Sequence, residues 1–561
     1  MQNKKTFFGL YCRNAAYLRV IKIVQVERKN KKYPIRRKDF AINHIYVIFA
    51  GMKFKSHILY IPVLLIIISL GAICSCSDST VYETEIDTKP ELTEPEPEQT
   101  EPAPDFYNTS FAVLADNKYI PVYTCKIAPE NAERRWKAMD DIINSKLYYD
   151  TAAFAYFGLK ESGADIKIYY PEKINTVKIL PSSAAIASSI QDNSVSFHLD
   201  KPANLTIEIN GNHTNSLHLF ANPPETDIPD ENDPNVIYFG PGTHELSNLH
   251  VRDNQTVYIA EGAIIKGVID PNEPSFYHND GSGLKGYSPL INIIGKNIII
   301  RGRGIIDCEN IPTHGKNTLR IWGENITVEG IIMTNPSVWT MPIVYSRNVN
   351  VNNVKILGHR THSDGIDICS SHNVTVDGCF IRTLDDLVVV KVLIDDGEFG
   401  HIEDRTAGDI VVKNCVLWNQ VAHALSIGAE ITDDVTNVLF ENCDVVHDIG
   451  REHTLRIFHS DAATVRNITF NNIRIEESKR LISLWIGESY WSSDAKRGNI
   501  KDVTFSNISA FGNPLRIEFK GGGPDSKIDN VMLKNITLNN NPLLTENIIK
   551  SGTVTNITVT P

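Results

Sequence analysis

Apolar and polar residues alternate through the first folded part of the chain, from residue 105 to about 235. Residues 166–169 read Ile-Lys-Ile-Tyr, and residues 205–210 read Leu-Thr-Ile-Glu-Ile-Asn. Because successive side chains of a strand point to opposite faces, this period of two indicates strands with one buried face. Several such runs in one short region predict a small β-sandwich over 105–235. The region carries no catalytic constellation, so we expect a packing or carbohydrate-contacting module.

A repeat replaces this alternation from about Val236 onward. A polar residue, usually Asn, opens a short apolar strand at spacings of 23 to 36 residues. These opening residues are Asn297, Asn325, Asn348, Asn373, Asp409, Asn437, Asn467, Asp502, Asn530 and Asn556. No amphipathic helix of ordinary length fits between the strands, which argues against leucine-rich and α/β solenoids. The repeat predicts a coil of about 25 residues per turn, with apolar side chains stacked inside and Asn side chains in a ladder at the bends.

The fold class predicted is therefore all-β, a right-handed parallel β-helix over 236–561 preceded by the small β-sandwich. The handedness follows from the usual rule for parallel crossovers. The two longest spacings mark insertions at 392–408 and 486–499. We expect these insertions to form loops that wall a groove.

Residues 52–75 have the features of a bacterial signal peptide. Lys53 and Lys55 give a positive start, and residues 58–73 form an almost unbroken apolar run. This run is short for a membrane span, which needs about 20 apolar residues, and small residues follow it, as a cleavage site requires. Residues 73–76, Ile-Cys-Ser-Cys, resemble a lipoprotein box, which makes Cys76 the expected site of lipidation.

The segments on either side of this signal are predicted to have no folded core. Residues 1–51 are interpreted as an upstream extension that is not part of the mature protein. Residues 76–104 are rich in Pro, Glu and Thr and are predicted to form an acidic linker. We therefore expect a monomer that is lipid-anchored to the outer membrane, at the cell surface or in the periplasm.

Composition and charge narrow the range of partners. The 561 residues are 42% hydrophobic and 22% charged, which is typical of a globular protein. From Cys76 onward 41 basic residues stand against 65 acidic ones, a net charge of −24. Because a protein with this net charge repels polyanions, nucleic acid is not an expected partner. The cysteines after the signal form no C-x-x-C pair, so no metal site and no cofactor is predicted, and Cys379, Cys415 and Cys443 are expected to be buried apolar residues.

A pair of acidic motifs is the first sign of chemistry. Asp364 is followed 21 residues later by Asp385 and Asp386, which is about one turn of the predicted coil. Stacked strands lie about 4.8 Å apart, so the three carboxylates should meet on one face. Their mutual repulsion raises the pKa of at least one of them, which then keeps its proton near neutral pH. A proton donor beside ionised carboxylates is what glycosidic bond cleavage needs.

Two further motifs follow in order. Residues 422–428 read Ala-His-Ala-Leu-Ser-Ile-Gly, and Arg456 begins Arg-Ile-Phe 33 residues after His423. With the motifs at 362–367 and 385–386, this array resembles glycoside hydrolase family 28, the polygalacturonase-like β-helix enzymes of pectin and cell-wall degradation. The family motifs are N-T-D-G-x-D, D-D, G-H-G-L-S-I-G and R-I-K, and the similarity extends over roughly 236–480.

The resemblance implies a role for each matched residue. Asp386 would be the general acid, and Asp364 and Asp385 would position and deprotonate the attacking water. His423 would tune the acid or its neighbours, and Arg456 would contact the sugar. The family inverts the anomeric configuration in a single displacement, without a metal or other cofactor, so the implied partner is a polysaccharide or oligosaccharide substrate.

Two departures from the family motifs affect the predicted substrate. His362 replaces the family's first Asn, and Phe458 replaces the lysine that pairs with the galacturonate carboxylate. Because a phenylalanine cannot pair with an anion, we expect a neutral sugar or a mixed, branched glycan in place of long homogalacturonan. Residues 217–223 are also similar to the dextranase-like family 49, which leaves an α-glucan substrate as an alternative.

Other residues are weaker candidates for the groove. Lys391 and Glu430 lie near the motifs in sequence, and Tyr490 and Trp491 in the second insertion are candidate sugar platforms. We expect Trp339 to pack within the coil. Two other classes of protein remain open, a non-catalytic surface glycan binder and a polysaccharide lyase. The lyase is disfavoured because no basic cluster stands beside acidic ligands for calcium.

Overall fold

A computed structural model describes residues 110–128, 149–277, 284–393 and 402–561. The predicted extension, signal and linker over 1–51, 52–75 and 76–104 lie outside the described residues, as does Cys76. Lipidation and location therefore stay predictions. In the part of the chain that is described, no helix has the length and apolar character to cross a bilayer.

The described residues between 112 and 222 form two five-stranded sheets that share one apolar core. The first sheet contains, in spatial order, β2 (Lys118–Ile120), β1 (Ala112–Ala115), β5 (Ala164–Tyr169), β8 (Ser194–Leu199) and β7 (Ser188–Gln191). The second contains β3 (Val122–Ile127), β4 (Asp150–Gly158), β10 (Asn212–Asn222), β9 (Ala203–Ile209) and β6 (Val177–Leu180). The pairs are antiparallel except β4–β10, which is parallel. A short 3₁₀ turn, η1 (Ser182–Ala184), follows β6.

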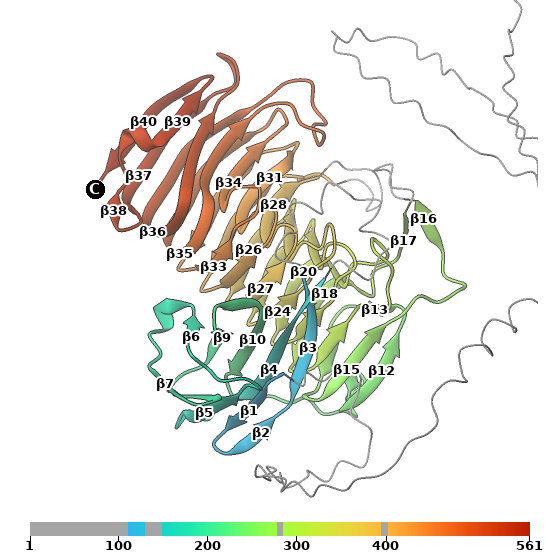
Figure 1. The fold of residues 1–561 in the computed structure, drawn as a ribbon. Coiled ribbons are helices and arrows are strands. Elements are labelled where there is room, and N and C mark those ends of the chain that lie inside the picture. Colours follow the sequence, from blue (N-terminus) through green and yellow to red (C-terminus); the bar gives the residue numbers. More distant parts are fainter. Residues whose placement is uncertain (1–109, 129–148, 278–283, 394–401) are drawn as a thin grey trace, which may run out of the picture. The chain divides into compact units, whose positions relative to one another are not determined.

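The rest of the described chain is a right-handed parallel β-helix, which confirms the predicted fold class (Figure 1). Its strands form three sheets. The ladder sheet contains β11 (Val236–Phe239), β14 (Thr256–Ile259), β18 (Ile291–Gly302), β20 (Leu319–Glu329), β23 (Arg347–Asn352), β26 (His372–Asp377), β29 (Ala407–Lys413), β32 (Val435–Glu441), β35 (Thr464–Ile486), β36 (Asn499–Lys520), β37 (Ile528–Leu538) and β40 (Val554–Thr560).

Each of the other two sheets also extends along the coil, with strands of successive turns paired in parallel. The docking sheet contains β12 (Gly242–Leu246), β15 (Ala263–Gly267), β19 (Ile305–Asp307), β21 (Ile332–Thr334), β24 (Lys355–Leu357), β27 (Phe380–Thr383), β30 (Val416–Asn419) and β33 (Asp444–Asp448). The groove sheet contains β13 (Leu249–Val251), β22 (Met341–Val344), β25 (Ile366–Cys369), β28 (Val388–Val392), β31 (Leu425–Ile431), β34 (Leu455–His459) and β39 (Ile548–Ser551). The long strands β18, β20, β35 and β36 bend from one sheet into another. Outside the three sheets lie the hairpin β16 (Ser275–Tyr277) and β17 (Lys285–Tyr287), the short β38 (Asn541–Pro542) and the 3₁₀ turn η2 (Thr545–Asn547).

The recurring Asn of the sequence repeat occupies the bend that opens each strand of the ladder sheet. Asn325, Asn348 and Asn373 have φ angles of 59°, 56° and 53°, in the left-handed region that Asn tolerates better than most residues. Each donates its side-chain N–H to the side-chain oxygen of the residue one turn earlier, at 2.6 to 3.0 Å. The repeat therefore encodes both the turn of the chain and the ladder between turns.

The interior of the coil is a continuous stack of apolar side chains. Successive turns place the rings of Phe440, Phe470 and Phe505 in parallel stacks with centroids 4.7 and 4.8 Å apart. Cysteines take part in the same packing. All six cysteines among the described residues are buried and free, which confirms the expectation for Cys379, Cys415 and Cys443; the other three are Cys125, Cys308 and Cys369.

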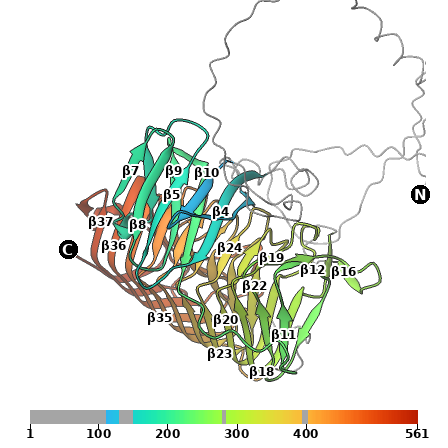
Figure 2. The ribbon, with the colours of Figure 1, turned by 90° about the horizontal axis from the view of Figure 1, so that it is seen from below.

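The sandwich packs against the docking sheet of the coil, where apolar side chains of β4 and β10 share a cluster with those of β24 and β27. Figure 2 shows β4 and β10 beside β24. Arg382 projects from the coil, stacks over the Trp418 ring at 3.5 Å and donates to the Ser216 hydroxyl of the sandwich at 3.1 Å. His447 joins the two parts, because its ring nitrogens contact Glu208 of the sandwich and Glu477 of the coil, each at 2.6 Å. The sandwich thus packs on one sheet of the coil while the acidic motifs lie on another.

The His447 bridge predicts a pH-dependent stability. Burial by itself lowers the pKa of His447, but hydrogen bonds to Glu208 and Glu477 raise it above the ordinary value. A group with a raised folded pKa contributes its full stability below its unfolded value, near pH 6.5, and loses this contribution as pH rises through the folded pKa. Replacing His447 by Gln is expected to cost about 3 kcal/mol near pH 6, because Glu208 loses a buried partner.

Thermal unfolding of the two proteins at about pH 6 and pH 9 measures this effect. The difference in Tm should shrink at the higher pH, where the unaltered protein has also lost the imidazolium. An equal difference at both pH values would contradict an ionic bridge and indicate lost packing alone.

Candidate functional site

The four sequence motifs lie on consecutive turns of the groove sheet. Ile366 of β25 pairs with Val388 of β28, which pairs with Leu425 of β31, which pairs with Leu455 of β34. These four side chains point into the core of the coil. Side chains alternate along a strand, so the positions between them point outward. The motifs therefore hold equivalent positions on successive turns, although their spacings along the chain are unequal.

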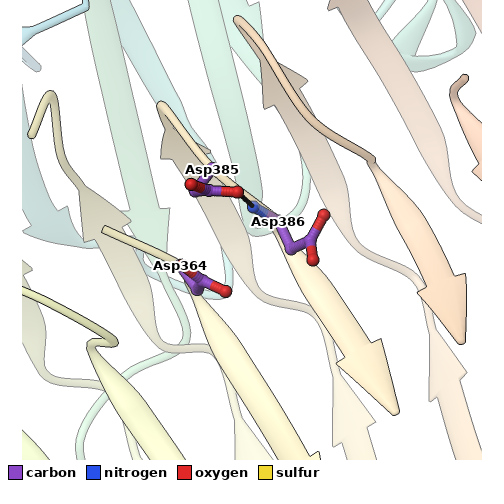
Figure 3. Close-up of side chains that lie close together, drawn as sticks. All are labelled: Asp364, Asp385 and Asp386. Carbon is purple, nitrogen blue, oxygen red and sulfur yellow. Dashed lines mark hydrogen bonds between the residues drawn. The ribbon is translucent and has the colours of Figure 1, made fainter. Parts of the chain in front are cut away.

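Three carboxylates meet just ahead of these strands, where the chain enters the groove sheet. Asp364 and Asp386 each stand two residues before a paired core position, so they occupy the same place on adjacent turns. One carboxylate oxygen from each of Asp364, Asp385 and Asp386 lies within 4.8 Å of the others (Figure 3). The Asp386 backbone N–H donates to Asp385 Oδ1 at 3.1 Å, which orients the pair. The spacing argument thus placed these residues correctly, and their catalytic roles stay predictions.

The surroundings of these carboxylates favour a bound proton. Asp364 is 3% exposed and Asp386 is 9% exposed. Burial raises the pKa of Asp364 well above its usual range, and the charges of Asp367 and Asp385 raise it further. Burial also raises the pKa of Asp386 well above its usual range, with Asp385 as the largest charged contributor. The cluster therefore combines a proton donor with carboxylates held close by.

His423 stands one turn beyond Asp386 and is held in one orientation. Its Nδ1 lies 2.8 Å from the carbonyl oxygen of His453 and donates to it, which leaves Nε2 as the acceptor facing Arg456 Nη1 at 3.3 Å. Burial lowers the pKa of His423 well below its ordinary value, and the charge of Arg456 lowers it further. The imidazole is therefore neutral. Its acceptor nitrogen keeps the Arg456 guanidinium over the groove.

Arg456 is further held by two neighbours. Its guanidinium donates to the carboxylate of Glu452. The guanidinium carbon also lies 4.2 Å from the centroid of the Phe458 ring, in a cation–π contact. Phe458 in turn meets the Trp485 ring edge-on at 4.7 Å. The aromatic residue at the family's lysine position thus supports the arginine from one side.

A cavity of about 510 Å³ surrounds the acidic cluster. Nearly all of the predicted site residues line it: His362, Asp364, Asp385, Asp386, Lys391, His423, Glu430, Arg456, Phe458 and Trp491. Tyr490 is absent from this lining and is 75% exposed, and its ring contacts Trp491 edge-on at 4.9 Å. The loop that carries Trp491 is anchored by Asp461, whose Oδ1 accepts the backbone N–H groups of Ser493 and Asp494 at 2.6 and 2.9 Å.

Other lining residues escaped the sequence analysis. Trp339 was expected to pack within the coil, and this expectation was wrong, because Trp339 lines the cavity under the Lys391 ammonium. It lies on the groove sheet two residues before Met341, the same place that Asp364 holds one turn later, and this register was the missed signal. His314 stacks on His362 with centroids 4.7 Å apart. Phe276 and Tyr287 reach the cavity from the hairpin β16–β17, for which the repeat pattern gave no signal.

The acidic cluster also has the composition of a cation site. Asp364, Asp385 and Asp386 are the one group of His, Cys, Asp and Glu side chains in the described part of the chain close enough to share a metal ion. The ammonium of Lys391 already lies 3.4 Å from Asp364 Oδ2 and supplies positive charge there.

Fold and site together define a parallel β-helix protein with three carboxylates in a cavity of its groove sheet. Residues 307–560 match the model of glycosyl hydrolases family 28. This part of the chain is thus similar to the family that the motifs resemble.

Two curated relatives illustrate the similarity. The exopolygalacturonase clone GBGE184 of Arabidopsis thaliana is 26% identical over 195 residues, which cover 33% of this chain and 42% of the relative. The probable endopolygalacturonase D of Neosartorya fischeri is 26% identical over 362 residues, or 63% of this chain and 61% of the relative. The chain thus spans less than two thirds of the length of both relatives.

Among solved structures, Dex49A from Penicillium minioluteum aligns with a TM-score of 0.50 at 15% identity, over 78% of this chain and 90% of that one. The polygalacturonase from Erwinia carotovora aligns with a TM-score of 0.41 at 17% identity, over 62% and 90% of the two chains. At this level of identity the likeness to Dex49A concerns the fold alone.

Proposed function

We propose that this protein is a glycoside hydrolase that cleaves a pectin-like polysaccharide with inversion at the anomeric carbon. The convergence of Asp364, Asp385 and Asp386 in one cavity carries the proposal. The match of residues 307–560 to the family model supports it, and two similar proteins bear polygalacturonase names.

Each acidic residue has a distinct task in the proposed reaction. Asp386 holds its proton because it is buried beside Asp385, and it delivers this proton to the leaving glycosidic oxygen. Asp364 and Asp385 bind the attacking water and take up its proton. Water forms the new bond to the anomeric carbon as the old bond breaks, so that no covalent intermediate arises.

His423 and Arg456 shape the sugar site in this proposal. The neutral imidazole accepts from the guanidinium, which therefore points one N–H edge at a fixed place above the groove sheet. From there Arg456 can donate to a hydroxyl or ring oxygen of the sugar. Because His423 carries no charge, it leaves the proton of Asp386 in place.

The substrate is proposed to be a neutral sugar or a mixed, branched glycan. Lys391 of the cavity lining pairs with Asp364 and Asp367. Arg451 and Arg456 both contact Glu452. Each of these cations thus contacts an acidic residue of the chain, and Phe458 adds no charge for a galacturonate carboxylate. The opening of the cavity toward Trp491 and Phe276 offers apolar surface for sugar rings.

Two alternatives, hydrolysis of an α-glucan and binding of a glycan without cleavage, can be distinguished from this proposal by experiment. Residues 217–222 belong to β10, whose Leu217 and Leu219 pack in the sandwich core. This segment is therefore a structural strand of the sandwich. A binder would retain a polysaccharide without releasing any sugar from it.

The test is a screen of neutral and acidic plant polysaccharides and of dextran, with sizing of the products. Polygalacturonate, its methyl-esterified form and a xylose-substituted galacturonan are informative members. We expect new reducing ends from a pectin-type substrate and none from dextran. Release from dextran would favour the α-glucan reading, and binding without release would favour the binder.

The stereochemical outcome is a separate prediction. Oxygens of the three carboxylates lie within 4.8 Å, whereas the acid and the base of most inverting enzymes are separated by about 6.5–9.5 Å. Inversion is therefore proposed on the family resemblance. Proton NMR of the first product, recorded before mutarotation, should show the anomer opposite to that of the substrate bond. Retention of configuration would overturn the single-displacement mechanism.

A further inference from the structure

Lys391 projects from β28 into the acidic cluster and is almost fully enclosed. It is 5% exposed, and its ammonium lies 3.4 Å from Asp364 Oδ2 and 3.1 Å from Asp367 Oδ1. The indole of Trp339 covers a third side, with its centroid 3.9 Å from the ammonium. Two carboxylates and an aromatic face therefore occupy the space around this charge.

Asp367 lies on β25, three residues after Asp364, and has no exposed surface. On the adjacent turn Lys391 pairs with Cys369, two residues after Asp367, and its ammonium reaches back to the Asp367 carboxylate. A buried carboxylate is costly unless a partner compensates its charge. Asp367 therefore requires Lys391, and Lys391 is correspondingly fixed between two acids.

We propose that Lys391 is a positioning residue that lowers the cost of ionising Asp364 and orients its carboxylate to activate water, and that it does not bind the substrate. This inference rests on the proposed function. It adds that Lys391 determines which carboxyl group of the cluster gives up its proton. Lys391 forms its ion pairs with Asp364 and Asp367, and the Asp386 carboxyl can keep its hydrogen.

The titratable groups around Lys391 lie on strands β25 and β31 and on the residues that precede β25 and β28. Asp364, Asp367 and the Cys369 thiol belong to β25 and the residues before it, Asp385 and Asp386 precede β28, and Glu430 lies on β31. Burial alone lowers the pKa of Lys391, but Asp367, Glu430 and Asp364 raise it well above its ordinary value. The ammonium therefore stays charged throughout the working pH range. Burial raises the pKa of Asp367 to about 6, against the opposing effect of Lys391.

The first test is a mutant cycle read by thermal unfolding between about pH 4.5 and pH 8. Lys391→Met leaves the buried acids uncompensated. A carboxyl whose folded pKa is raised loses stability as pH rises through that pKa, so the Tm deficit of Lys391→Met should grow with pH. We expect a small deficit at pH 4.5 and roughly 5 °C or more at pH 8.

The second variant of the cycle adds Asp367→Asn to Lys391→Met. The amide matches the carboxylate in shape and removes one negative charge. If Lys391 acts by balancing charge, the double variant should recover more than half of the deficit at pH 8. Failure of Asp367→Asn to restore the Tm would overturn the proposal and indicate that Lys391 contributes only packing.

The activity of the same variants separates positioning from substrate binding. Lys391→Met should lower kcat about 100-fold with little change in KM, and its acidic limb of kcat/KM should move up by about one pH unit or more. Lys391→Arg should restore part of kcat and return the limb toward its original pH. A rise in KM with kcat unchanged would instead make Lys391 a substrate ligand and refute the inference.

Lys266→Met is the matched control. Lys266 is an ion-paired lysine of the same coil, 2.6 Å from the buried Asp307, and it does not line the cavity. Its loss should lower Tm and leave the pH profile of hydrolysis unchanged. If the unaltered protein hydrolyses nothing in the polysaccharide screen, the proposed function fails, while the Tm cycle still decides whether Lys391 balances the acidic cluster.

Discussion

Replacement of Asp386 by Asn is expected to reduce kcat about 1,000-fold or more. The amide fills the same space beside Asp385 but has no proton to give to the leaving oxygen, and general acid catalysis contributes about 10²–10⁴ in rate. Folding should not suffer. Because burial raises the pKa of Asp386, its ionisation opposes folding at neutral pH, and Asn removes this cost. We therefore expect the Tm of Asp386→Asn at pH 7 to equal or exceed that of the unaltered protein.

Reducing-end release measures the loss of kcat, and retention of the same polysaccharide on the protein measures binding. Asp409→Asn is a matched control, because Asp409 occupies a bend of the ladder sheet where most other turns carry Asn. It should leave kcat unchanged. A substrate with an activated leaving group, such as a nitrophenyl glycoside, should recover most of the activity of Asp386→Asn. More than a tenth of the original kcat on polysaccharide would show that Asp386 is not the general acid.

Replacement of Phe458 by Lys is expected to raise the preference for polygalacturonate over its methyl-esterified form about tenfold or more. The substitution restores the residue that the family motif carries at this position. An ammonium paired with a carboxylate contributes about 1.5–3 kcal/mol when it is partly buried, which corresponds to at least a tenfold change in relative kcat/KM. Phe458 lies beside Arg456 at the rim of the cavity, so the new charge would face the bound sugar.

Phe458→Met separates the gained charge from the lost ring. It removes the cation–π contact with Arg456 and adds no charge, so it should reduce activity on both polymers to the same extent. The comparison uses kcat/KM values on the two polymers at one ionic strength, because salt screens the new interaction. An unchanged preference in Phe458→Lys would show that the substrate carboxylate does not approach this position, and the substrate argument from Phe458 would fail.

The repeat and the motifs determined much of this protein. Asn at the ladder bends specifies a left-handed residue and a side-chain hydrogen bond at once, which is why a spacing pattern predicts both the turn and the stacking of turns. Asp364 and Asp386 could be placed together because one turn of the coil separates them. Both inferences are local, since each turn contacts only its neighbours.

Contacts between segments far apart in the chain were decided only by the tertiary structure. The period of two says that Asp367 points away from the core, but not that Lys391 lies between Asp367 and Trp339. The hairpin that brings Tyr287 to the cavity and the bridge from His447 to the sandwich lack any periodic signal. An outward side chain meets whatever the rest of the chain lays over that face, and this depends on register and docking, which no single stretch of sequence carries.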